Sequence, residues 1–192
     1  MKFDQDAFPQ GLPVITADLK GTKVFDPRNN ATAWSDNPAL CLRNYLTNTR
    51  YGRGIATSLI DDTSFNVAAN YCDTTVNIGG ATVKRYTTNG IVNTQKGSMV
   101  IIRELLTSCK GFLIFSGGKY KLIIDKPESA GFTFDEDNIT GAWKIALGSK
   151  NGQFNRIRGE FINKDKDWQT DLAVIESTAL RTQDNGILLE KT

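Results

Sequence analysis

The 192-residue sequence contains no histidine. Histidine is the commonest general base at neutral pH, and its absence removes the Ser-His and Cys-His nucleophile pairs together with zinc sites that need an imidazole ligand. Any catalysis by this chain would therefore rest on carboxylates, lysine or a metal.

Cysteine is scarce as well. Cys41, Cys72 and Cys109 are three in number and lie too far apart for a C-x-x-C metal or redox motif. Free cysteine behaves as a small apolar residue, so we expect buried, reduced thiols.

The sequence has no run of the roughly 20 apolar residues that a membrane span requires, and its first residues, "MKFDQDAFPQ", lack the apolar core of a secretory signal. Its net charge is +2, from 23 basic and 21 acidic residues, which does not fit a dedicated nucleic-acid binder. With 40% hydrophobic and 23% charged residues, the composition predicts a soluble globular chain of one domain or two small ones.

Three segments have the apolar spacing of amphipathic helices. The first begins at about Pro38, with Asp36 or Asn37 as its cap, and ends at Asn48 to Gly52. Its predicted buried face consists of Ala39, Leu42, Leu46 and, at the edge, Tyr45, while Arg43 and Asn44 point away.

The second predicted helix has Asp62 or Thr63 as its cap and carries its apolar stripe as far as Val76. The third lies in "GSMVIIRELLTSCKG", closed by Lys110 and Gly111. All three cysteines fall on these helices.

The firmest strand prediction is a hairpin in "FLIFSGGKYKLIID", because Gly117 and Gly118 can take the positive φ of a two-residue turn. We expect two short strands around Lys20-Gly21, a loop in "DPRNNATAW", and a strand in "TVKRYTTNGIVN" that pairs with a later segment.

Beyond the connector "KPESAG", the runs "AWKIALGSK", "FNRIRGEFINK" and "DLAVIES" have the period of antiparallel strands. Ile157, Gly159 and Phe161 are predicted to form a dry face opposite Arg156, Arg158 and Glu160. The final run, "GILLEKT", has no closing element, so we expect the chain to be a piece of something longer.

Together these patterns predict an α+β fold: a three-helix module with antiparallel strands, followed by a mostly antiparallel β segment. The expected organisation is an N-terminal β arm at 1–33, an α+β module at 34–126 and an antiparallel β segment at 127–192 that further sequence would complete.

Few residues suggest chemistry. Asp135, Glu136 and Asp137 could hold Ca²⁺ or supply a glycosidase pair, but they suit the acidic start of a short helical turn better. Asp61 and Asp62 are interpreted as helix-start charge. No catalytic, cofactor-binding or metal-binding residue is assigned.

A possible interface is formed by Arg50, Tyr51 and Arg53, where basic and aromatic residues alternate at the exit of the first helix. A solvated helix exit is the simpler interpretation, and a phosphate-binding or base-stacking role is the alternative. Direct nucleic-acid binding through these arginines with Arg156 and Arg158 is a weaker hypothesis. Trp34, Trp143 and Trp168 are interpreted as anchors for packing or partner contact.

The order of several phrases resembles a known family. The segment "GLPVITADLKGTKVFDPRNNATAWSDNPALCLRNYLTNTRYGRGI", followed by "FNVAANYCDTTV", "RYTTNGIVNT", "LLTSCKGFLIFSGGKYKL" and "FNRIRGEFINKDKDWQ", is similar to tail tip attachment proteins of long-tailed bacteriophages and prophages (protein J and host-specificity proteins). The resemblance covers nearly the whole chain. Asp26, Pro27 and Arg28 match a recurring motif, which we interpret as a turn with an Asp-Arg pair.

The resemblance implies a structural fragment of a phage tail tip or baseplate hub, involved in tail assembly and host attachment and not an enzyme. It implies other tail proteins as partners, a homotrimer in the full-length protein, and a place in the virion tail after assembly in the bacterial cytoplasm. It implies no cofactor, no small-molecule substrate, no specific nucleic-acid ligand and no membrane span. The alternative is a tail-associated, carboxylate-based polysaccharide or cell-wall hydrolase.

Overall fold

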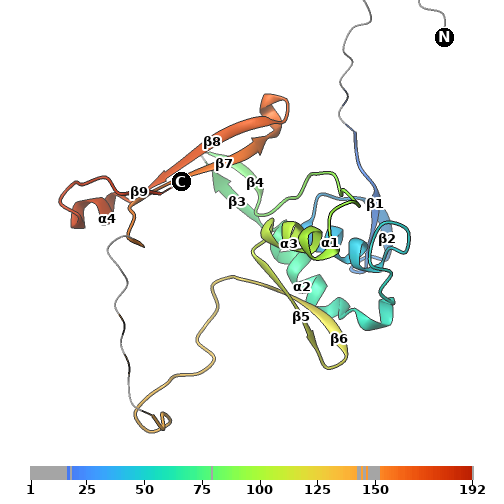
Figure 1. Cartoon of the computed structure of the whole chain (residues 1–192), viewed down its shortest axis with the longest axis horizontal. Helices are drawn as coiled ribbons and strands as arrows, with labels where there is room; N and C mark the ends of the chain where they lie inside the picture. Colours follow the sequence, from blue (N-terminus) through green and yellow to red (C-terminus); the bar gives the residue numbers. More distant parts are fainter. Residues whose placement is uncertain are drawn as a thin grey trace, which may run out of the picture. The chain divides into compact units, whose positions relative to one another are not determined.

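The structure is a computed structural model that describes residue 17 and residues 19–78, 80–141, 144, 146 and 152–191. The chain divides into two compact units, Met1–Ser129 and Ala130–Thr192, each with helix and strand (Figure 1). The predicted α+β class is confirmed, whereas the likeness to a baseplate hub and the three-segment division stay predictions. The described residues do not include Trp143, most of the run 142–150 or most of the strand expected before Lys20.

Three helices form the centre of the first unit: α1 (Pro38–Thr47), α2 (Asp62–Asp73) and α3 (Ser98–Thr107). The predicted start of α1 at Pro38 is confirmed. Asn37 caps it, because its Oδ1 accepts from the backbone N–H groups of Ala39 and Leu40 at 3.1 and 3.4 Å. Its Nδ2 donates to the carbonyl of Ala69 in α2 at 2.9 Å, so one buried amide joins the two helices.

Three antiparallel hairpins accompany the helices in Figure 1: β1 (Lys23–Asp26) with β2 (Ala31–Trp34), β3 (Thr75–Ile78) with β4 (Ala81–Lys84), and β5 (Gly111–Ser116) with β6 (Lys119–Ile124). The last is the hairpin predicted around Gly117 and Gly118, both of which have positive φ. The buried core draws on all three helices together with β1 and β6, and its largest fully buried apolar side chains include Phe65, Leu40, Leu42 and Leu46.

Helix α2 is shorter than predicted. It ends at Asp73, and Val76 lies in β3 instead of on the helical stripe. Thr74, Thr75 and Val76 are all β-branched, which favours extended backbone over helix. The strand predicted in "TVKRYTTNGIVN" stops at Lys84, and it pairs with the segment before it, so the expected later partner was wrong.

The expected loop at Asp26–Trp34 was also wrong in its second half. Residues 27–30 form the turn, with Asn30 at φ 56°, but Ala31–Trp34 return as β2. The turn predicted at residues 27–30 is present. The composition of the segment did not indicate β2, whose four residues form a strand because they pair with β1.

The prediction that Arg43 faces solvent was wrong. Its side chain is buried, and its Nε and Nη2 donate to the two carboxylate oxygens of Asp62 at 2.7 and 2.9 Å. Its guanidinium carbon lies 5.1 Å from the centre of the Phe25 ring. Because β1 and the start of α2 pack against α1, this face is enclosed, and the buried charge is paired as burial requires.

The second unit contains β7 (Arg156–Asn163) and β8 (Gln169–Glu176) as an antiparallel pair, a short helix α4 (Thr178–Gln183) and β9 (Glu190–Lys191), which pairs in parallel with β7. Helix α4 was not predicted. Asn155 is nearly inaccessible to solvent and holds the segment that joins α4 to β9. Its side-chain amide donates to Asp184 and to the carbonyl of Ile187 at 2.9 and 2.8 Å.

The dry face predicted for β7 is not dry. Ile157 and Phe161 are 44% and 46% exposed, and Ile175, opposite Ile157, is 72% exposed. Apolar and charged residues alternate along β7 as predicted, but no helix or strand in the described part of this unit covers the apolar face. None of the helices in the described ranges is long and apolar enough to cross a membrane.

The Asn37→Ala substitution should lower the free energy of unfolding by about 2–4 kcal/mol, because it removes the cap of α1 and leaves the buried carbonyl of Ala69 without its donor. Asn93→Ala is the matched control, since Asn93 is exposed and accepts one bond from the backbone of Gln95. Its expected effect is within about 0.5 kcal/mol. Denaturant titration measures both, and equal effects would contradict the role given to Asn37.

All three thiols should be unreactive in the native chain at neutral pH. Burial, aided by the charge of Asp36, raises the pKa of Cys41 to about 11, and a hydrogen bond with Cys109 together with burial raises the pKa of Cys72. The same hydrogen bond lowers the pKa of Cys109, but Cys109 is only 1% exposed, so a reagent does not reach its thiol in the folded chain. A chromogenic disulfide reagent should therefore label the chain slowly until guanidinium unfolds it, after which all three cysteines react. Rapid labelling of the folded chain, mapped by mass spectrometry, would overturn this expectation.

Candidate functional site

The segment Arg50–Arg53, predicted as a possible interface, folds back over the C-terminal end of α1. Asn48 Oδ1 accepts from the backbone N–H groups of Arg50 and Tyr51 at 2.8 and 3.1 Å. The backbone N–H of Arg53 donates to the carbonyl of Tyr45 at 2.9 Å. The end of the helix thus has its carbonyl groups satisfied by the segment that follows it.

Gly52 makes this return possible. A Cβ atom at this position would lie 1.9 Å from the carbonyl oxygen of Tyr45, so no larger residue fits without moving the backbone. Sequence reasoning took Gly52 as a stop signal, and the structure adds the close backbone approach that explains it.

The three side chains of the segment have different surroundings. Tyr51 is half-buried against the core, and its hydroxyl accepts from Asn44 Nδ2 at 2.8 Å. Arg50 and Arg53 are exposed, and Arg53 Nη1 donates to Ser98 Oγ at the start of α3 at 3.1 Å. Tyr51 is therefore an anchor, and the two arginines form the accessible part of the predicted interface, which stays a prediction.

Arg156 and Arg158 belong to the other unit and share one counter-ion. Each lies 3.2 Å from a carboxylate oxygen of Glu190 in β9. The carboxylate offsets part of their charge, and the nucleic-acid hypothesis gains no support from this pairing.

The acidic cluster Asp135–Asp137 lies on an exposed turn. Asp135 Oδ1 accepts from the backbone N–H groups of Asp137 and Asn138 at 3.1 and 3.2 Å, so it acts as the cap of the predicted helical turn. Within the described ranges, no three Asp, Glu or Cys residues are grouped so that they could hold a metal ion. The hydrolase alternative stays a prediction.

The Asp26-Arg28 pair predicted from the sequence is confirmed and is part of a larger network. Arg28 binds both carboxylate oxygens of Asp26, with Nε to Oδ1 at 2.9 Å and Nη2 to Oδ2 at 2.7 Å, and its Nη1 lies 2.9 Å from Asp73 at the end of α2. Lys84 of β4 then joins Asp73 to Asp36 at 3.4 and 2.8 Å. Sequence reasoning missed the distant members, because nothing in the spacing of residues 28, 73 and 84 shows that they meet.

These contacts lower the pKa of two carboxyl groups. Hydrogen bonds from Arg28 hold the pKa of Asp26 below its ordinary value. Partial burial alone would raise the pKa of Asp73, but hydrogen bonds from Arg28 and Asn37 and the charge of Lys84 outweigh burial and lower it.

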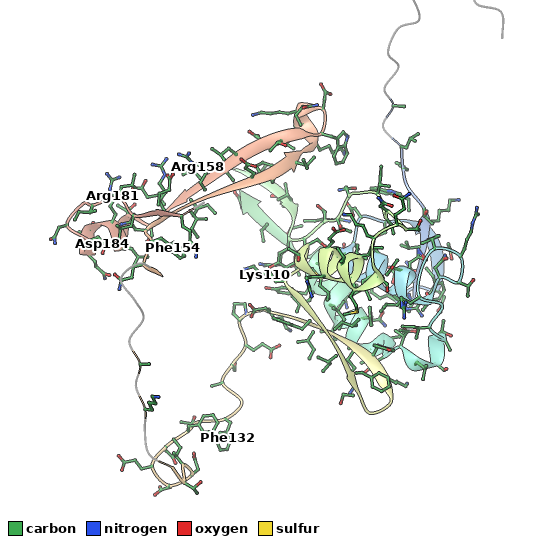
Figure 2. The ribbon with its side chains drawn as sticks, in the orientation of Figure 1. Lys110, Phe132, Phe154, Arg158, Arg181 and Asp184 are labelled. Atoms are coloured by element: carbon green, nitrogen blue, oxygen red, sulfur yellow. The ribbon has the colours of Figure 1, made fainter. Side chains whose placement is uncertain are left out.

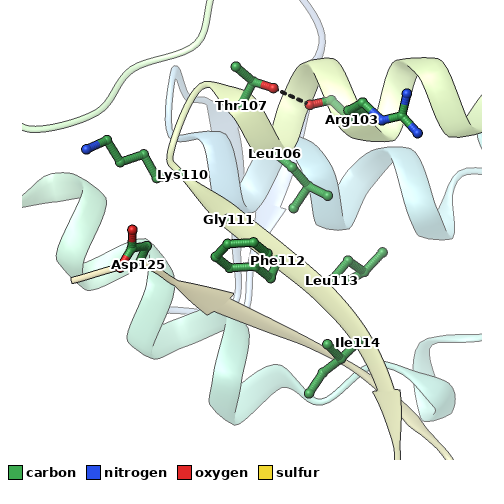
Figure 3. Close-up of a pocket in the computed structure, with 9 residues that line it drawn as sticks. All are labelled: Arg103, Leu106, Thr107, Lys110, Gly111, Phe112, Leu113, Ile114 and Asp125. Carbon is green, nitrogen blue, oxygen red and sulfur yellow. Dashed lines mark hydrogen bonds between the residues drawn. The ribbon is translucent and has the colours of Figure 1, made fainter. Parts of the chain in front are cut away.

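The hairpin β5–β6 presents an apolar surface that the sequence did not reveal. Phe112, Ile114 and Ile123 are 60%, 40% and 49% exposed, and Phe112 lies directly opposite Ile123 in the register. A groove of about 630 Å³ runs between β5 and the last turns of α3, as Figure 3 shows. It is lined by Arg103, Leu106, Thr107, Lys110, Gly111, Phe112, Leu113, Ile114 and Asp125.

A second apolar feature lies in the other unit. Phe132, labelled in Figure 2, and Phe134 are 65% and 71% exposed, with ring centres 5.0 Å apart. The two rings meet edge to face, and the acidic turn follows at once in the sequence. Apolar surface exposed in this way is typical of contact regions between proteins.

Comparison with known proteins gives the context. No family model matches the sequence. The tip attachment protein J of Escherichia phage SECphi27 is 27% identical in an alignment of 198 positions that covers 93% of this chain, and that of Escherichia phage SECphi4 is 24% identical in an alignment of 193 positions that covers 90%. This chain is a relative of tip attachment protein J. The family resemblance drawn from the sequence is confirmed, and the chain spans 16% and 17% of the length of these two relatives.

The Arg28→Met substitution tests the charge network through its pH dependence. At neutral pH it should cost about 1–2 kcal/mol of unfolding free energy. Because the folded-state pKa values of Asp26 and Asp73 are lowered, their contribution is present above the unfolded value of about 3.9 and is lost as pH falls through the folded values. Urea unfolding across this acidic range should show the gap between wild type and variant closing.

Arg50→Met is the control for this measurement, since it removes the same charge from an exposed site. Its curve should run parallel to that of the wild type. A gap for Arg28→Met that stays constant down to strongly acidic pH would contradict the network.

Proposed function

We propose that this chain is a structural part of a phage tail tip attachment protein and contributes to tail assembly and host attachment. The observation that carries the proposal is similarity along 93% of the chain to a protein named for tip attachment, together with a second such relative. Because the chain corresponds to about one sixth of those relatives, the activity of the whole protein is part of the proposal.

The surface of the chain supports a role in assembly. Large apolar side chains are exposed on the outer face of β5–β6, on β7–β8 and at Phe132 and Phe134. Surfaces of this kind are usually covered by neighbouring proteins. In a tail tip the neighbours would be other tail proteins and further copies of the same protein.

The proposal includes four finer points. The chain acts as scaffold and not as an enzyme, its full-length form is a homotrimer around the tail axis, its site of action is the virion tail, and assembly takes place in the bacterial cytoplasm. The charged residues that the described ranges bring together fit the scaffold role, since Arg28, Arg43 and Lys84 each join separate helices and strands.

Immunogold electron microscopy tests the location. Antibodies raised against this chain should label the tail tip of purified virions whose genome encodes it, and preimmune serum should not. Label confined to the lysate, with none on intact tails, would overturn the proposal. Light scattering of the longest protein that contains the chain tests the trimer, and a strictly monomeric protein would contradict that part.

A further inference from the structure

Strand β5 has a free edge. It pairs with β6 on one side, and none of the described residues forms a strand on the other. In a two-residue hairpin the residues that flank the turn, here Ser116 and Lys119, form a hydrogen-bonded pair, and bonded and non-bonded pairs alternate from there. The backbone N–H and C=O groups of Gly111, Leu113 and Phe115 therefore point to the free edge.

The contacts of β6 agree with this alternation. Tyr120 stands opposite Phe115 in a non-bonded pair, and its outward carbonyl accepts from the backbone N–H of Asp61 at 2.9 Å. Leu122 stands opposite Leu113, and its N–H donates outward to Ser64 Oγ at 3.1 Å. These two outer groups of β6 have partners within the chain, whereas Leu113 and Phe115 of β5 offer the corresponding groups to a new strand.

The face beside this edge is apolar and bordered by positive charge. Phe112, Ile114 and Ile123 form the face, as described above. Lys110 and Arg103 line the groove at one end, and Lys119 and Lys121 follow on the same face toward the turn. Asp125 is the acidic residue among those lining the groove, and Lys121 lies 3.9 Å from Asp61. The net charge around the face is positive, so an apolar segment with acidic residues would complement it.

The chain itself contains such a segment. In Gly131–Asp137, "GFTFDED", the two phenylalanines alternate with Thr133 as they would on one face of a strand, and three acidic residues follow. Both rings are exposed and lie on the same side of the backbone, with centres 5.0 Å apart. The segment has no helix or strand up to the acidic turn and is not part of a described sheet.

We propose that the segment Gly131–Asp137 of a second copy of this chain adds as a strand to the free edge of β5. Phe132 and Phe134 then cover Phe112, Ile114 and Ile123, and the acidic turn meets the lysines and arginine at the border of the face. The inference deepens the proposed tail function by naming the surface through which copies of the chain contact one another.

The donor is a second copy because the chain's own connection leaves β6 on the other side. Lys126 Nζ lies 5.7 Å from the centre of the Tyr71 ring in α2. Helix α2 packs against β6, whose residues Leu122 and Ile124 face the core, opposite to Phe112 and Ile123. Asp125 still lines the groove, and the next residue, Lys126, contacts α2, so exchange between copies uses the segment without breaking that contact.

Complementation between two variants of the full chain tests the proposal. Phe112→Asp should remove the acceptor face, and the double substitution Phe132→Ser with Phe134→Ser should remove the donor segment. All three side chains are exposed, so both variants should keep the wild-type circular dichroism spectrum and unfolding midpoint. Sedimentation velocity should show each variant alone self-associating at least about tenfold more weakly than wild type.

A mixture of the two variants should form heterodimers, because one chain keeps an intact face and the other an intact segment. Ile91→Ser is the matched control, since Ile91 is 96% exposed elsewhere and its loss should leave association unchanged. Hydrogen exchange should show the amides of Leu113 and Phe115 protected in the associated state and unprotected in the variants.

Three results would overturn the inference: a wild-type chain that stays monomeric at all concentrations, variants that associate like wild type, or a mixture with no heterodimer. If the mixture forms no heterodimer and the amides on the free edge of β5 stay protected at every dilution, the segment docks on its own chain. These outcomes do not depend on the immunogold test of the tail location. If the chain is monomeric but antibodies label the tail tip, the proposed function holds and this inference fails. If the chain self-associates but antibodies do not label the tail tip, this inference holds and the proposed function fails.

Discussion

Helix α1 is enclosed by β1, α2 and α3 together, and this enclosure determines much of the first unit. Leu40, Leu42 and Leu46 are fully buried, so the helix has apolar contacts on more than one side. A polar group in such a position must find a partner within the protein, because an unpaired one costs several kcal/mol, on the order of 2–7 by transfer measurements. Asn37 and Arg43 meet this requirement by reaching α2, at Ala69 and Asp62. The same contacts that satisfy burial also fix the position of α2 against α1.

Charged groups then attach the hairpins to the helices. Arg28 in the β1–β2 turn reaches Asp73 at the end of α2, and Lys84 of β4 joins Asp73 to Asp36 before α1. These residues are partly exposed, so each pair alone contributes modestly. As a network they give the hairpins β1–β2 and β3–β4 a defined place beside the helices, which two-stranded ribbons do not achieve alone.

Local signals in the sequence were enough to predict elements with their own caps and turns. Pro38 after Asn37, and Gly117-Gly118 between two apolar runs, each specify a backbone conformation within a few residues. The network around Arg28 and the burial of Arg43 were not predictable in the same way, because each depends on a partner more than ten residues away. The end of α2 was missed because β3 pairs with β4, the next strand along the chain, and this pairing was not predicted. The exposed face of β5–β6 was hidden for a related reason: in "GFLIFSGGKYKLII" both faces of the hairpin are apolar, and only packing against α2 decides which one is covered.

The return of the chain over the end of α1 has a consequence for recognition. Arg50 and Arg53 lie on backbone that is held by hydrogen bonds to Asn48 and Tyr45, and Gly52 permits the close approach to Tyr45. A partner that used these arginines would meet a preorganised backbone, so binding would restrict only side-chain rotations. Such a surface favours fast, repeatable docking over adjustment to fit.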